Sequence, residues 1–248
     1  MARFPRLTSS VVFYALVATV ISAAFAVTLW VQYRAKPRPY LLAWSVALGV
    51  YAIAALAEVI GAAAGWDPFL YRIYYFLGGI TVVGILALGT TYLLAPRFGR
   101  QTLGLLVVLV GIGLVGILGA NLQVGLLDTH QVPSADVIKL QHGIFNVAAI
   151  LMAAILNIVG SLILIGGAIW SFLAMFLKGA PPSRLVGNIL IAGGAFIVAG
   201  ASTLFRVFHV YDLFYVGQAI GVLVMFGGFL AAQRAPRRVA NLNPATSR

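Results

Sequence analysis

The chain has 248 residues, of which 62% are hydrophobic and only 8% are charged, and its mean hydropathy is +1.05. Soluble domains carry about 25% charged residues, so a water-soluble fold is excluded and lipid is the expected solvent. The chain contains 0 cysteines, which excludes disulfides and thiolate metal sites. The formal charge of +11 does not indicate nucleic-acid binding, because the cations occur in short runs between apolar segments, as membrane orientation requires.

Long apolar runs fill most of the chain. A helix needs about 20 predominantly apolar residues to cross a bilayer. The runs are continuous and do not alternate, which favours helices over barrel strands. Proline and glycine mark the breaks between them. We therefore predict an all-α polytopic membrane protein with a seven-transmembrane-helix bundle, the spans being Ser10–Tyr33, Tyr40–Ala64, Phe69–Leu94, Thr102–Leu126, Gly143–Leu177, Leu185–Phe208 and Leu213–Gln233.

The basic residues predict the orientation of the bundle. Of the 16 Lys and Arg residues, 11 fall in connections on one side, and positively charged loops face the cytoplasm. This places the C-terminus in the cytoplasm and the N-terminus outside, and the first apolar run is too long for a signal peptide. We expect residues 1–233 to form a single transmembrane domain and residues 234–248 to be a basic, disordered cytoplasmic tail.

The connection between the fourth and fifth spans is the largest. Ser134 is a typical N-cap residue, and Asp136 would then lie in the first turn of a helix. The fifth helix is therefore expected to begin outside the bilayer, which would account for its excess length.

Glu58 lies in the middle of an apolar segment. At seven-residue spacing it shares a helical stripe with Trp44 and Tyr51, and neighbouring alanines indicate that this stripe faces other helices. A charge at this depth costs at least ~2.5–3.5 kcal/mol on insertion scales. Glu58 is therefore either a ligand anchor or proton site, or a structural ion pair with Arg72 or Arg206.

A second group of polar and aromatic residues lies in the outer half of the predicted bundle. It forms either a pocket that opens outward or an interfacial belt of tyrosines and snorkelling arginines. The residues expected to make a ligand site or an intramembrane polar network are Glu58, Arg72, Tyr75, Asn146, Arg206, His209, Asp212 and Gln218.

Other chemistries find little support in the sequence. The three histidines, His130, His142 and His209, lack the spacing of metal or haem sites. No lysine lies in the last span to form a Schiff base with retinal, and no catalytic motif is present. We expect no cofactor, no metal and no enzymatic activity.

Glu58 is followed by a basic residue, Arg72, and by an aromatic-x-x-glycine pattern that begins at Tyr75. This arrangement resembles the N-terminal seven-helix sensor region of certain bacterial membrane histidine kinases. The resemblance rests on Trp44, Tyr51, Glu58, Arg72, Tyr75, Gly78, Leu88 and Tyr92, and on the start of the last span, Asp212–Tyr215. In that family a kinase or cyclase follows the last helix, whereas here Arg248 follows it closely. The resemblance implies a free-standing sensor module, or part of a larger assembly, in the bacterial inner membrane.

We therefore expect a non-enzymatic, receptor-like or sensory module with an outward-facing pocket that acts through a partner protein or a homo-oligomer. Contact would run through the membrane or the basic cytoplasmic surface. One alternative is a small-solute transporter, because Phe69–Gly79 and Asp212–Gly221 are weakly similar and would fit parallel three-helix repeats. The other alternative is a structural accessory subunit of a membrane complex.

Overall fold

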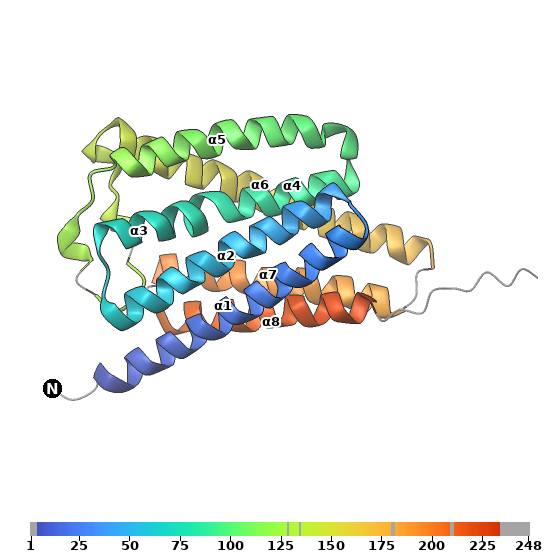
Figure 1. Ribbon diagram of the computed structural model, residues 1–248, viewed down its shortest axis with the longest axis horizontal. Coiled ribbons are helices and arrows are strands. Elements are labelled where there is room, and N and C mark those ends of the chain that lie inside the picture. Colours follow the sequence, from blue (N-terminus) through green and yellow to red (C-terminus); the bar gives the residue numbers. More distant parts are fainter. Residues whose placement is uncertain (1–3, 128, 134, 180–181, 209–210, 234–248) are drawn as a thin grey trace, which may run out of the picture.

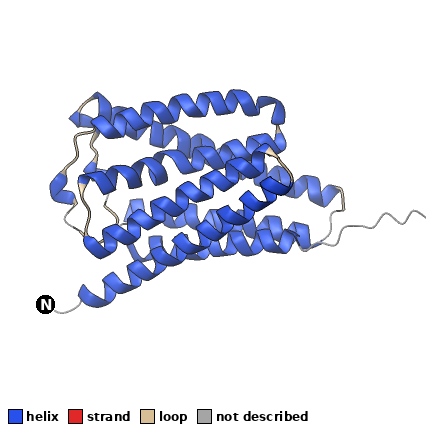
Figure 2. Cartoon of the chain, in the orientation of Figure 1, coloured by secondary structure: helices blue, strands red, loops and turns tan. Residues whose placement is uncertain are grey.

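The computed structural model is helical apart from turns and one isolated bridge between Leu122 and Ile138 in the part of the chain that it describes (Figure 2). It describes residues 4–127, 129–133, 135–179, 182–208 and 211–233, and all side chains of these except 4–10, 135, 182–184, 203–208, 211–212 and 233. The helices are α1 (Phe4–Ala35), α2 (Pro39–Ala64), α3 (Pro68–Tyr74), α4 (Val82–Leu94), α5 (Gly99–Gly119), α6 (Ile144–Leu177), α7 (Pro182–Phe208) and α8 (Tyr211–Gln233).

Seven helical stretches within the described ranges are long and apolar enough to cross a membrane. The third of them, Pro68–Leu94, consists of α3, the π-helical segment η1 (Tyr75–Thr81) and α4, which follow one another without a break. The prediction of an all-α, seven-helix, multi-pass membrane protein is thereby confirmed. The side on which each end lies stays a prediction.

A short turn reverses the chain between α2 and α3. Gly65 ends α2 with a φ of 88°, a conformation that side chains with a Cβ rarely adopt. The Asp67 carboxylate then accepts hydrogen bonds from the backbone N–H groups of Phe69 and Leu70, at 2.7 and 3.0 Å, and caps α3. The turn fixes the heights at which Glu58 and Arg72 enter the bundle.

The helices pack as a bundle in which α5 and α8 lie on opposite sides (Figure 1). α1 packs on α2 and α8, α4 packs on α2 and α6, and α5 packs chiefly on α6. α7 packs chiefly on α8. The helices α2, α4 and α8 therefore supply most of the interior, whereas α5, α6 and α7 present much of their surface to lipid.

Glycines bring the backbones of α7 and α8 into direct contact. A Cβ on Gly221 would lie 2.7 Å from the carbonyl oxygen of Gly194, and one on Gly228 would lie 2.8 Å from that of Gly187. No larger residue fits such a seam, and small residues are what allow membrane helices to approach so closely. The two helices therefore form one tightly joined hairpin.

Residues 120–143 cover one end of the bundle, which also carries the α2–α3 turn and which we call the loop end. Leu127, Val132 and Val137 are at most 2% exposed. The backbone N–H of Val132 donates to the Tyr215 hydroxyl at 2.8 Å, and His130 Nδ1 lies 3.1 Å from the carbonyl oxygen of Ala62. This segment is thus attached to both α2 and α8.

On either side of this segment, the expected end of the fourth span and the expected helix start at Ser134 are wrong, whereas the expected span Gly143–Leu177 agrees with α6 within one residue. The fourth span ends at Gly119 rather than Leu126, because Ala120 is extended (φ −65°, ψ 137°). The fifth helix begins at Ile144, after Gly143 with a φ of 115°. Asp136 lies instead in a 3₁₀ turn, Ala135–Val137, and Ser134 is outside the described residues. Apolar residues continue beyond Gly119, so hydropathy alone could not locate the end of α5.

Candidate functional site

Glu58 is buried inside the bundle, where α2 faces α8. The residue is 3% exposed, and its carboxyl group accepts hydrogen bonds from Gln218 Nε2 at 3.2 Å (to Oε1) and 3.3 Å (to Oε2). The Tyr51 hydroxyl donates to Gln218 Oε1 at 2.7 Å. These three side chains form what we call the α2–α8 network. Within it, both partner groups are neutral.

The depth of the network follows from helix geometry. Glu58 lies six residues before the end of α2 at Ala64, which corresponds to about 9 Å at 1.5 Å per residue. Tyr51 lies two turns further from the loop end. Glu58 therefore lies in the half of α2 nearer the loop end, and Tyr51 lies near the midpoint of the helix.

Arg72 does not pair with Glu58, contrary to one of the two expected ion pairs. Its Nε donates to the carbonyl oxygen of Ile117 at 3.0 Å, and its Nη2 donates to that of Ala120 at 2.9 Å. The last carbonyls of a helix lack intrahelical donors and carry partial negative charge. The C-terminus of α5 therefore competes for the guanidinium, and Arg72 caps this helix.

Asn146 completes the same cap. Its Oδ1 accepts from the backbone N–H of Asn121 at 2.8 Å, and its Nδ2 donates to the carbonyl oxygen of Asn121 at 3.0 Å. Asn121 Nδ2 in turn donates to the carbonyl oxygen of His142 at 2.9 Å. We call Arg72, Asn121 and Asn146 the α5 cap. It joins the end of α5 to the start of α6.

Tyr75 lies at the start of the π-helical segment, with its ring centroid 5.9 Å from that of Tyr71. Further along the segment, Asn157 Nδ2 donates to the carbonyl oxygen of Gly79 at 2.6 Å, and Thr81 Oγ1 donates to that of Phe76 at 2.8 Å. A π turn displaces carbonyl groups from the regular α-helical pattern, and π segments recur at functional sites. Here side chains satisfy the displaced groups.

Three of the expected site residues cannot be assigned partners. The backbones of Arg206 and Asp212 lie in α7 and α8, but their side chains are outside the described part of the chain, as is all of His209. The ion pair expected between Glu58 and Arg206 therefore stays a prediction. Elsewhere in the described residues, no three His, Asp or Glu side chains come together as a metal site would require.

The expected residues thus separate into two groups. Glu58 and Gln218 belong to the α2–α8 network, whereas Arg72 and Asn146 belong to the α5 cap. Tyr51 was absent from the expected site, although its seven-residue spacing from Glu58 placed it on the same stripe. Asn121 was missed because nothing local to it in the sequence marks a helix cap.

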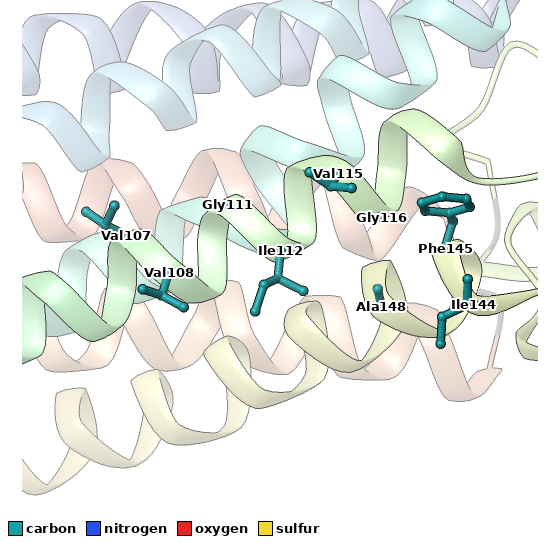
Figure 3. Close-up of a pocket in the computed structure, with 9 residues that line it drawn as sticks. All are labelled: Val107, Val108, Gly111, Ile112, Val115, Gly116, Ile144, Phe145 and Ala148. Carbon is teal, nitrogen blue, oxygen red and sulfur yellow. The ribbon is translucent and has the colours of Figure 1, made fainter.

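The network residues do not line an open cavity in this structure, since Glu58 and Gln218 are 3% and 4% exposed. A groove of about 470 Å³ lies elsewhere, between α5 and α6 (Figure 3). Apolar side chains and two glycines line it, among them Val107, Gly111, Ile112 and Phe145. It has none of the polar groups that would orient a ligand.

Comparison of the chain with models of protein families, with curated proteins and with solved structures finds no match. The resemblance to histidine kinase sensor regions therefore stays a prediction. On its own features, the chain is a seven-helix membrane protein with a buried acid held between α2 and α8.

Proposed function

We propose that the chain is a non-enzymatic, receptor-like or sensory membrane module that passes a signal to a partner protein. The observation that carries this proposal is the bond between Glu58 and Gln218, which links α2 to the last span in the bundle. Intramembrane acids are functional sites by default, because burying them is costly. A change at Glu58 would act directly on α8, and thereby on the basic residues 234–248 that follow it.

A cluster of buried apolar residues lies between the network and the end of the bundle opposite the loop end. This cluster supports a sensor over a transporter. Phe25, Leu29 and Leu48 are buried there, and Phe25 packs on Phe226 and Phe229 with ring centroids 5.1 and 4.9 Å away. Leu48 lies one turn from Tyr51. A transporter needs a polar route to both faces of the membrane. These apolar contacts interrupt such a route on the side of Tyr51 that faces away from the loop end.

The first test asks whether the network controls the position of α8. The chain has 0 cysteines, so Val46→Cys on α2 and Leu223→Cys on α8, both exposed, can carry spin labels on an otherwise unlabelled protein. We expect Gln218→Leu to change the distance distribution between the labels, because it removes the hydrogen bond that joins the helices. Gln101→Leu, at an exposed position on α5, is the matched control.

The second test asks what the chain does with its signal. We expect affinity isolation after gentle solubilisation to recover a stoichiometric membrane partner. Replacing Arg234, Arg237 and Arg238 with Gln should weaken its retention, with the largest effect at low salt, where charge attraction is least screened. Isolation of the chain alone, together with solute counterflow in liposomes that Glu58→Gln abolishes, would instead favour the transporter.

A further inference from the structure

The groups that face Glu58 provide no counter-charge among the described side chains. On its own helix the nearest titratable group is Tyr51, and on α8 the neighbours are the neutral amide of Gln218 and, one turn away, Tyr215. On the third span, the guanidinium of Arg72 is engaged by carbonyl groups of α5. His130 contacts α2 one turn from Glu58, with its Nδ1 at 3.1 Å from the carbonyl oxygen of Ala62. The side chains of Arg206 and Asp212 and all of His209 are outside the described residues.

Space around Glu58 restricts what could neutralise it. Glu58 and Gln218 are 3% and 4% exposed, and the groove between α5 and α6 lies away from them. A metal ion would need several oxygen ligands, and an organic cation would need a cavity of its own size. A proton needs neither. It also removes the cost of placing a charge in the low-dielectric interior.

Gln218 is suited to both protonation states of the acid. Its amide presents a donor and an acceptor at nearly equal reach. In this structure, Nε2 donates to Glu58 and Oε1 accepts from Tyr51, an arrangement that fits either a carboxylate or the carbonyl oxygen of the neutral acid. Next to a carboxylic acid, rotation of the amide by a half-turn lets Oε1 accept from the Glu58 O–H while Nε2 donates to the Tyr51 oxygen. The exchange needs no movement of the backbone.

We propose that Glu58 is a proton-binding site and that the proton is the ligand that the α2–α8 network recognises. This inference rests on the proposed sensory function. In the binding step, a hydronium ion from the aqueous phase gives one proton to a Glu58 carboxylate oxygen, a water molecule is released and the charge of the side chain changes from −1 to 0. The neutral acid is compatible with the buried side-chain contact between Glu58 and Gln218. The carboxylate favours hydration, and thus separation of the two helices.

The composition of the chain allows Glu58 to be observed selectively, because it is the one glutamate and the other four acids are aspartates. Glutamate labelled with ¹³C at the side-chain carboxyl therefore reports on this group alone, in the wild-type protein. In lipid nanodiscs, we expect its NMR signal to move from the protonated to the ionised position as pH rises. The distance between spin labels at Val46→Cys and Leu223→Cys should increase over the same pH interval.

The outcomes separate the two proposals. A carboxyl signal that stays protonated, or stays ionised, over the whole pH range in which the protein is folded overturns the proton site. So does a signal that is ionised in the wild type but protonated in Arg206→Gln, since Arg206 would then be the counter-ion. A carboxyl that titrates while the label distance stays fixed retains the proton site and refutes the sensory function.

A variant tests the coupling between the two events. In Gln218→Leu, the carboxyl should still titrate, because the proton binds to Glu58 itself. The label distance should no longer follow the titration, because the hydrogen bond to α8 is lost. If the distance in this variant tracks the titration as fully as in the wild type, the proton does not act through the network. If added sodium or an alkylammonium ion moves the ¹³C signal at constant pH, the ligand is a larger cation and the inference is wrong.

Discussion

The α2–α8 network and the α5 cap lie at the same half of the bundle, but they satisfy their polar groups in different ways. In the α5 cap, Arg72 and Asn146 bond to backbone groups of residues 117–121. In the network, the hydrogen bonds join one side chain to another, and among the described side chains the acid receives only neutral donors. The cap completes a helix end, whereas the network holds a titratable group between two helices.

The difference indicates where a change of state can occur. Backbone groups must be paired wherever water is excluded, so the partners in the cap are fixed by the fold. The partners in the network can exchange donor and acceptor roles without unfolding a helix. We therefore expect substitutions in the cap to affect stability, and substitutions in the network to affect response.

The largest effect is expected at Arg72. Arg72→Leu leaves the carbonyls of Ile117 and Ala120 without their charged donor, and hydrogen bonds to charged groups contribute about 1.5–3 kcal/mol each. We expect a loss of about 3 kcal/mol in the free energy of unfolding, measured by equilibrium unfolding in mixed detergent micelles. Arg72→Lys, which can still donate to one carbonyl, should lose less. Equal losses in the two variants would contradict the capping role.

Asn146 should show the next largest effect. It is fully buried and makes two hydrogen bonds to the backbone of Asn121, so Asn146→Ala should cost about 2 kcal/mol at roughly 1 kcal/mol per bond. The matched control is Asn188→Ala, which loses a single long contact of 3.4 Å to the carbonyl oxygen of Ala168. The same unfolding measurement should give the control a clearly smaller loss.

Glu58→Gln tests the network against the remaining ion-pair alternative. An amide at position 58 can still accept from Gln218, so we expect a change of less than about 1 kcal/mol. If Arg206 is the hidden partner of Glu58, the substitution leaves a buried cation unpaired and costs about 3–5 kcal/mol. A double-mutant cycle with Arg206→Gln distinguishes the two cases, since strong coupling would establish the ion pair.

The last comparison concerns two tryptophans, one near each end of α2. Trp44 Nε1 donates to the carbonyl oxygen of Leu86 at 3.2 Å, whereas the buried Trp66 Nε1 has no hydrogen-bond partner in the described structure. Both Trp→Phe variants lose packing, but only Trp44→Phe also loses a bond. It should therefore be the more destabilising by about 1 kcal/mol. Equal losses would mean that the Trp66 indole has a partner in the membrane.

The sequence alone determined the class of the protein, the number of its spans and the burial of Glu58 within the bundle. These properties are local, because hydropathy over a window reports on the solvent that surrounds a helix. The turn at Gly65 and Asp67 was equally readable, since a left-handed glycine and an N-cap act within a few residues. The end of α5 was not, because the apolar composition continues beyond Gly119. The predicted span Gly143–Leu177 matches α6 within one residue, but the helix start expected at Ser134 is wrong.

Only the tertiary structure decided which polar groups meet. Arg72 was the cation nearest to Glu58 along the chain, yet it caps α5 through carbonyls 45 and 48 positions away. Glu58 instead bonds to Gln218, 160 positions away. The sequence shows that a buried polar group needs a partner, but the choice depends on helix rotation and height in the bundle. These are set by packing of small and apolar side chains, such as the glycine seam between α7 and α8, over the whole length of the helices.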